Sequence, residues 1–184
     1  MAEEMVPVLT RAEIAKKVKS LAQRISEDYA GKELIAIGVL KGAFIFMADL
    51  IRELTVPSRV DFVRLASYGS NTTSSGTIRI TKDVELDIRG RDVLIVEDIV
   101  DSGLTIAYLI KHLESFSPKS VKVCAFIDKT ERRDVQVPVD YVGLVVKHGF
   151  LVGYGLDFAE KYRVLPAIYR IVSQMKGVHH GRDL

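Results

Sequence analysis

Three carboxylates and a glycine-containing turn lie close together near the middle of the chain. Glu97 and Asp98 directly follow residues 93–96, an apolar run with the length and composition of a buried strand. Asp101 comes next, followed by a polar turn at residues 102–105, where a helical spacing of apolar residues begins. A helix start presents unpaired backbone N–H groups and the positive end of the helix dipole, so this turn is typical of a phosphate-binding site.

The paired acids Glu97 and Asp98 suit a different part of such a ligand. Carboxylates repel a phosphate, but they accept hydrogen bonds from sugar hydroxyls and bind hard cations such as Mg²⁺. A diol beside a phosphate describes a ribose 5-phosphate unit. The simpler alternative is that both acids only cap the helix that follows.

Apolar segments of strand length alternate with amphipathic helical segments along the chain. The first predicted helix begins at the capping box of Thr10 and Glu13 and ends before Gly31. Further helices are predicted at residues 43–54 and from the 102–105 turn to about residue 116. Strands are predicted at residues 34–40, 59–66, twice within 78–88, 93–96, 121–127, 141–146, 151–155 and 167–172. This order predicts an α/β fold with a central parallel twisted sheet flanked by helices on both faces.

Polar or glycine-containing pairs stand at the ends of four predicted strands. They are Lys41-Gly42, Ser67-Tyr68, Glu97-Asp98 and Asp128-Lys129. In an open parallel sheet, ligands bind beyond the carboxyl ends of the strands, so we expect the site at this edge. Residues 67–76 are nearly all small or hydroxylated, which predicts a mobile loop there.

Composition narrows the class of protein. The chain has 184 residues, of which 48% are hydrophobic and 27% charged, which predicts one soluble globular domain. The net charge of +2 does not favour nucleic acid or a membrane as a partner, and no apolar run is long enough to span a bilayer. The only cysteine, Cys124, lies in an apolar run and is predicted to be a core thiol, and we expect a cytoplasmic location. His179 and His180 lie in a polar tail that is expected to be disordered.

Several common nucleotide and metal motifs are missing from the sequence. No glycine-rich loop ends in Gly-Lys-Ser/Thr, and Gly153-Tyr-Gly155 lacks the third glycine of the dinucleotide fingerprint. No histidine pair has the spacing of a zinc site. These absences argue against a P-loop kinase, an NAD enzyme and a zinc hydrolase.

Residues 94–105, Leu-Ile-Val-Glu-Asp-Ile-Val-Asp-Ser-Gly-Leu-Thr, resemble the phosphoribosyl pyrophosphate (PRPP) signature of the type I phosphoribosyltransferases. Four further segments resemble the hypoxanthine-guanine branch of that family. They are residues 40–42, residues 67–69 with 74–76, residues 128–130 and residues 150–163. The segments occur in the family's order, and the resemblance spans roughly residues 8–172.

The resemblance implies an enzyme of purine salvage. Hypoxanthine or guanine would displace pyrophosphate from PRPP and give IMP or GMP, with Mg²⁺ as the cofactor. It also implies one domain over residues 1–184, with a small hood formed by the N- and C-terminal segments and a lid loop at about residues 67–83. The expected assembly is a homodimer or homotetramer.

The resemblance further implies roles on the PRPP side of the site. Glu97 and Asp98 would hold the ribose hydroxyls and a first Mg²⁺, and Asp101 would act as the catalytic acid and base near N7 of the purine. The groups that would bind phosphate and pyrophosphate are Lys41, Gly42, Ser102, Gly103, Leu104, Thr105 and Arg163. The family's loop at Lys41 and Gly42 often contains a non-proline cis peptide.

On the purine side, Lys129 would donate a hydrogen bond to O6, which selects a 6-oxopurine over adenine. Phe150 would stack on the base. Leu151, through its backbone, and Asp157 would complete the purine site, and Asp157 would also bind a second Mg²⁺. Ser67 and Tyr68 would belong to the lid. The simpler but less favoured alternatives are that Lys129 is a solvated strand-end lysine, Phe150 a core residue, Asp157 a turn cap and Arg163 one half of a surface ion pair.

Two rival functions follow from the same pattern. A regulatory protein on this scaffold would bind PRPP or a nucleotide and should carry a basic nucleic-acid face, which the charge does not favour. A transferase for adenine or uracil is disfavoured by Lys129 and Phe150. Residues 147–149, Lys-His-Gly, replace the Pro-Asp pair and charged residue common in the family, so the ranking of hypoxanthine, guanine and xanthine stays open.

Overall fold

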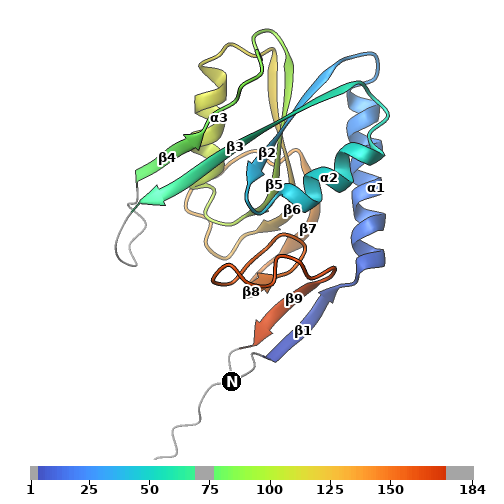
Figure 1. Cartoon of the computed structure of the whole chain (residues 1–184), viewed down its shortest axis with the longest axis vertical. Coiled ribbons are helices and arrows are strands. Elements are labelled where there is room, and N and C mark those ends of the chain that lie inside the picture. Colours follow the sequence, from blue (N-terminus) through green and yellow to red (C-terminus); the bar gives the residue numbers. More distant parts are fainter. Residues whose placement is uncertain (1–3, 69–76, 173–184) are drawn as a thin grey trace, which may run out of the picture.

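Apolar strands form the centre of a six-stranded sheet (Figure 1). The computed structural model describes residues 4–68 and 77–172. The strands of this sheet are β2 (Leu34–Leu40), β3 (Ser58–Tyr68), β4 (Thr77–Lys82), β5 (Asp92–Val100), β6 (Ser120–Lys129) and β7 (Tyr141–Val146). Their order is β4-β3-β2-β5-β6-β7, and only β4 runs antiparallel to its neighbour. The predicted α/β fold with a central parallel sheet is confirmed.

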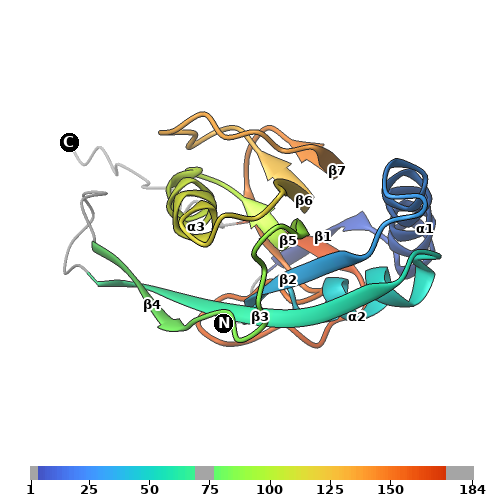
Figure 2. The ribbon, with the colours of Figure 1, turned by 90° about the horizontal axis from the view of Figure 1, so that it is seen from above.

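Both faces of the sheet are buried, as continuous apolar strands require. The helices α1 (Arg11–Asp28) and α2 (Phe44–Glu53) lie on one side and α3 (Leu104–Glu114) on the other (Figure 2). Successive β2 side chains alternate between the two cores: Leu34 and Ala36 pack with α1 and α2, whereas Ile35 and Ile37 pack with α3. The pleat of a two-sided strand therefore explains why residues 34–40 carry no charge.

The two ends of the chain form a second, three-stranded antiparallel sheet. Its order is β1 (Glu4–Leu9), β9 (Ile168–Val172) and β8 (Phe150–Val152). The small substructure expected from the terminal segments is thus present. The sequence analysis did not predict β1, because Pro7 breaks the usual strand pattern. A proline is tolerated here because β1 is an edge strand, and its pairing with β9 shifts register at that point.

The strand β5 is longer than predicted. The strand was expected to cover residues 93–96 and to end before Glu97, but its pairing with β6 continues as far as Val100. Pairing with β2 stops at Val96, opposite Gly38, whereas β2 itself continues to Leu40 along β3. Glu97 and Asp98 therefore lie inside a strand, just beyond its last paired position with β2.

Two strands were predicted within residues 78–88, and the prediction of the second is wrong. Residues 77–82 form β4, but residues 83–91 are not a strand. The Asp61 carboxylate accepts the backbone N–H groups of Glu85 (2.7 Å) and Leu86 (2.9 Å), which replaces a ladder of strand hydrogen bonds. The alternating apolar residues of this segment still pack against the α3 core, which accounts for the misleading pattern.

Two expectations lie outside the described residues. They are the central part of the lid, residues 69–76, and the tail with His179 and His180. None of the helices in the described part of the chain is long and apolar enough to cross a membrane.

The first helix provides a test of local stability. The Thr10 hydroxyl accepts the Glu13 N–H (3.3 Å), and the Glu13 carboxylate accepts the Thr10 N–H (2.8 Å), so the predicted capping box is confirmed. Thr10→Ala should lower the free energy of unfolding by about 1 kcal/mol, because one orphan N–H loses its acceptor. Urea unfolding measures this, and Thr10→Ser should retain most of the stability. Equal losses for both variants would contradict the role of the hydroxyl.

Candidate active site

The loop after β2 lies directly against the acids of β5. A Cβ placed on Gly42 would lie 1.9 Å from Asp98 Oδ2, so a side chain at this position would require the Asp98 carboxylate to move. The peptide bond between Leu40 and Lys41 is cis, as expected from the resemblance. On the other side of β5, Lys129 Nζ lies 3.4 Å from Asp101 Oδ2. The ends of β2, β5 and β6 therefore meet at one edge of the sheet, as predicted.

The turn between β5 and α3 encloses a small cavity of about 140 Å³. Its lining includes Glu97, Ile99, Val100, Asp101, Ser102, Gly103, Thr105 and Ile106. Gly103 caps α3 with a left-handed backbone (φ 83°), and a Cβ there would lie 2.3 Å from the Val135 carbonyl oxygen. The predicted turn is thus built for close backbone approach, with the start of a helix beside three acids. Leu104, the first residue of α3, is outside this lining, and its N–H bonds to Ser102 Oγ at 3.3 Å.

The acids of β5 are in unusual electrostatic surroundings. Glu97 is only 6% exposed, and burial, followed by the neighbouring charge of Asp98, raises its pKa well above the usual value. Asp101 differs, because one carboxylate oxygen faces Lys129. The other, Oδ1, is buried without a hydrogen-bond partner in the described part of the chain. Such orphaned buried oxygens are rare, so this atom is available to a ligand.

Lys129 is buried between two carboxylates. Its side chain is 8% exposed, and Nζ lies 3.4 Å from Asp101 Oδ2 and 3.5 Å from Glu131 Oε2. Glu131 also accepts the Gly149 N–H at 3.3 Å, which lowers the pKa of Glu131. It thereby joins Lys129 to the residue that precedes Phe150. Glu131 was missed in the sequence analysis, because its spacing from Gly149 carries no local signal.

Arg133 supports the turn that begins at Asp101. It is a second residue that was not predicted from the sequence. Its guanidinium forms a buried ion pair with Asp128 and donates to the carbonyl oxygens of Asp101 (2.9 Å), Val100 (3.2 Å) and Lys129 (3.1 Å). The following backbone N–H groups, at residues 134 and 135, donate to the Ser102 carbonyl. Only the folded structure shows that this loop supports the turn.

The loop between β8 and β9, residues 153–167, covers the Lys41 side of the site. A Cβ on Gly155 would lie 2.1 Å from the Gly42 carbonyl oxygen, so the two loops touch through their backbones. Arg163 pairs with Asp157 at 2.7 Å and donates to the Gly155 carbonyl, also at 2.7 Å.

Glu160 was also missed by the sequence analysis. It pairs with Lys41 at 2.9 Å and lies 3.6 Å from Arg163. The hydrogen bond from Lys41 lowers the pKa of Glu160. Lys41, Asp157 and Arg163 are therefore brought together around a carboxylate that lies within the family-like segment of residues 150–163 but was assigned no role from the sequence.

Two of the predicted purine-side residues, Phe150 and Leu151, lie on β8 and differ in exposure. Phe150 is 48% exposed and lies edge-on to Phe158, with ring centroids 5.3 Å apart, so it is not the core residue of the simpler reading. Leu151 is buried and pairs with Arg170 of β9.

The two predicted lid residues, Ser67 and Tyr68, are the last residues of β3, directly before the undescribed residues.

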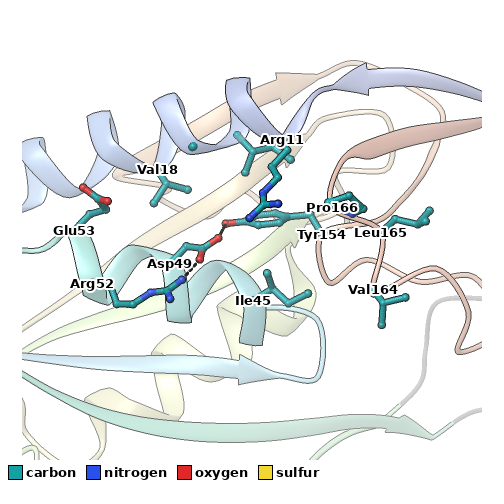
Figure 3. Close-up of a pocket in the computed structure, with 12 residues that line it drawn as sticks. Arg11, Val18, Ile45, Asp49, Arg52, Glu53, Tyr154, Val164, Leu165 and Pro166 are labelled. Atoms are coloured by element: carbon teal, nitrogen blue, oxygen red, sulfur yellow. Dashed lines mark hydrogen bonds and ion pairs between the residues drawn. The ribbon is translucent and has the colours of Figure 1, made fainter.

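A larger cavity, of about 660 Å³, lies elsewhere, between α1, α2 and residues 164–166 (Figure 3). None of the predicted site residues lines it. The Tyr154 hydroxyl in this cavity donates to Asp49 at 2.8 Å, and Asp49 pairs with Arg52 (Figure 3). This contact anchors the β8–β9 loop to α2. Cavity size alone therefore indicates a different region from the chemistry of the residues, which indicates the edge of the sheet.

The buried acid generates a prediction about stability and pH. Because the folded-state pKa of Glu97 is raised, the native state binds more protons than the unfolded state once the pH exceeds the unfolded value of about 4.5. Rising pH should therefore destabilise the native state through this group, up to the folded-state pKa. Glu97→Gln should be more stable than the unchanged protein, by a margin that is larger at about pH 8 than at about pH 5. Urea unfolding without divalent cations measures both margins, and equal margins would contradict the assigned pKa direction.

Comparison with known proteins identifies relatives over most of the chain. Residues 8–159 match the phosphoribosyl transferase domain family. The chain is 45% identical over 172 residues to a hypoxanthine phosphoribosyltransferase from Salmonella typhimurium, covering 92% of this chain and 95% of that protein. It is 45% identical over 161 residues to a hypoxanthine-guanine phosphoribosyltransferase from Bacillus subtilis, covering 88% and 89%. A crystal structure of a hypoxanthine-guanine phosphoribosyltransferase from Bacillus anthracis superposes with a TM-score of 0.87 at 42% identity, covering 94% of this chain and all of that one.

Proposed function

Because the chain belongs to the hypoxanthine(-guanine) phosphoribosyltransferases of purine salvage, we propose that the edge formed by β2, β5 and β6 binds PRPP and a 6-oxopurine together. The observation that carries this proposal is the cavity at residues 97–106, where a glycine-capped helix start lies beside the buried Glu97 and the half-buried Asp101. A phosphate and a sugar diol need these two environments at adjacent positions. The relatives' names identify the reaction, and the proposal concerns which residues of this chain perform it.

On the PRPP side, the turn of Ser102, Gly103, Leu104 and Thr105 is proposed to hold the 5-phosphate. Backbone N–H groups at a helix N-terminus are suited to an anion, and the left-handed Gly103 allows close approach. Glu97 and Asp98 are proposed to accept hydrogen bonds from the ribose hydroxyls. Pairing with β2 has ended before these acids, so one edge of their strand is turned toward the Lys41-Gly42 loop.

The donor set also fits Mg²⁺. Magnesium in phosphate-transfer sites usually takes one or two protein carboxylates, with water and substrate oxygens completing the octahedron. Within the described residues, no three His, Cys, Asp or Glu side chains are grouped so that they could hold a metal ion by themselves. Glu97 and Asp98 would hold a first ion and Asp157 a second. Bound there, Mg²⁺ would neutralise charge on the pyrophosphate as it leaves.

Asp101 is proposed to exchange a proton with N7 of the purine as N9 forms its bond to C1′ and pyrophosphate departs. Its Oδ1 atom is buried and unpartnered in the described part of the chain, so it has a free position for an N–H donor. Its other oxygen is held by Lys129. A carboxylate oriented in this way meets the geometric requirement for an acid–base group.

Lys129 is proposed to donate to the purine O6. Its Nζ lies beside two carboxylates, and a lysine ammonium cannot accept a hydrogen bond from the amino group of adenine. The exposed face of Phe150 would stack on the base, and Leu151 and Asp157 would contact its edge. Lys41, Gly42 and Arg163 would bind the pyrophosphate, and Ser67 and Tyr68 would close over the site and exclude water.

We further propose a homodimer or homotetramer as the working assembly.

The proposed substrates can be tested directly. The purified chain should form nucleoside monophosphate from PRPP with hypoxanthine or guanine when Mg²⁺ is present, and EDTA should abolish the activity. Adenine should not react, because it presents an amino group to Lys129 where a 6-oxopurine presents the acceptor O6. Xanthine should be included, since the ranking of the 6-oxopurines is open. Absence of turnover with every 6-oxopurine would refute the proposal.

The role of Asp101 has its own test. Asp101→Asn should lower kcat about 10²- to 10⁴-fold, the usual contribution of a general acid or base, because the amide cannot accept the N7 proton. PRPP binding, measured by calorimetry, should change little. Asp134→Asn, in the neighbouring loop, is the matched control and should retain activity. Full activity in the Asp101 variant would exclude the acid–base role.

A further inference from the structure

Residues 158–161 form a tight turn with an uncommon backbone. Phe158 and Lys161 exchange both backbone hydrogen bonds, at 3.1 and 3.0 Å. The two central residues, Ala159 and Glu160, have φ angles of 50° and 63°. This left-handed geometry at both positions favours glycine, asparagine or aspartate, and a chain that has alanine and glutamate there adopts a strained conformation. Strain of this kind is retained where it places a functional group.

The turn directs the Glu160 carboxylate at two cations. Its Oε2 atom lies 2.9 Å from Lys41 Nζ and 3.6 Å from Arg163 Nη2. The Glu160 N–H is in turn held by Asp157 Oδ2 at 2.9 Å. One carboxylate thus bridges the two cationic residues that the proposed function assigns to pyrophosphate, although Lys41 follows β2 and Arg163 lies in the β8–β9 loop.

A ligand anion can replace Glu160 in its ion pairs with Lys41 and Arg163. The side chains of Lys41 and Glu160 are 47% and 65% exposed, and ion pairs this exposed to water are weak. Arg163 is 19% exposed, and its buried Nε has no hydrogen-bond partner in the described part of the chain, so it retains a donor for a ligand oxygen. A pyrophosphate group carries more charge and more oxygen atoms than one carboxylate, and it can therefore displace Glu160.

From this geometry we infer that Glu160 is a placeholder for pyrophosphate: its carboxylate occupies Lys41 and Arg163 in the free protein and gives them up when PRPP binds. The inference rests on the proposed function, which assigns both cations to pyrophosphate. Because the carboxylate competes for the same cations, it weakens the binding of PRPP and assists the release of pyrophosphate. Glu160 is then a residue that sets affinity on the pyrophosphate side and does not touch the purine.

The test replaces the carboxylate by an uncharged group of the same shape. Glu160→Gln should bind pyrophosphate and PRPP, each with Mg²⁺, about two- to fivefold more tightly, which is the range of an exposed ion pair. The KM for hypoxanthine should be unchanged. The difference from the unchanged protein should shrink as salt rises, because exposed charges are screened. Calorimetry with pyrophosphate and steady-state kinetics measure these quantities.

Two matched variants separate the possible outcomes. Glu114→Gln, at the far end of α3, makes the same change in net charge and should leave pyrophosphate affinity unchanged. Glu160→Asp keeps the charge and should not bind more tightly. Equal or weaker pyrophosphate binding by Glu160→Gln would overturn the placeholder role. Lys41→Met should weaken pyrophosphate binding. If it does not, the assignment of Lys41 under the proposed function is wrong, whatever Glu160 does.

Discussion

The packing of three backbone segments around Gly42 is the constraint on which the site depends. A Cβ on Gly42 would lie 1.9 Å from Asp98 Oδ2, and one on Gly155 would lie 2.1 Å from the Gly42 carbonyl oxygen. The loop after β2, the strand β5 and the β8–β9 loop therefore meet so closely that a side chain on Gly42 would displace the Asp98 carboxylate and one on Gly155 would clash with backbone. Tyr154, bonded to Asp49 of α2, anchors the third of these segments. Acids and bases that are distant in sequence become neighbours as a result.

Under the proposed function, this edge of the sheet is arranged for ligands at the expense of stability. Glu97 is buried beside another acid, and its raised pKa shows that the native state disfavours its charge. Oδ1 of Asp101 and Nε of Arg163 are buried without partners in the described part of the chain. Unpaired buried groups cost stability, so their presence at one edge is best explained by a ligand that satisfies them. Elsewhere the same sheet is packed with apolar side chains on both faces.

The parts of the site that were predictable have local signals. The turn at Gly103 needs a left-handed residue before a helix, and glycine reports that need within a few positions. Residues 34–40 are apolar throughout because both faces of β2 are buried. The failures have a common cause. The extent of β5 depends on pairing with β6, and residues 83–91 avoid a strand because Asp61, far earlier in the chain, binds their N–H groups.

By itself, the sequence determined the α/β fold class, the glycine-capped turn and the identity of the acids and cations at the strand ends. These follow from apolar periodicity and from side-chain chemistry, which are properties of short segments. Only the tertiary structure decided that Lys129 lies between Asp101 and Glu131, that Arg133 supports the turn, and that Glu160 reaches Lys41. Each of these contacts depends on how the ends of separate strands and loops pack together, and no local pattern encodes that packing.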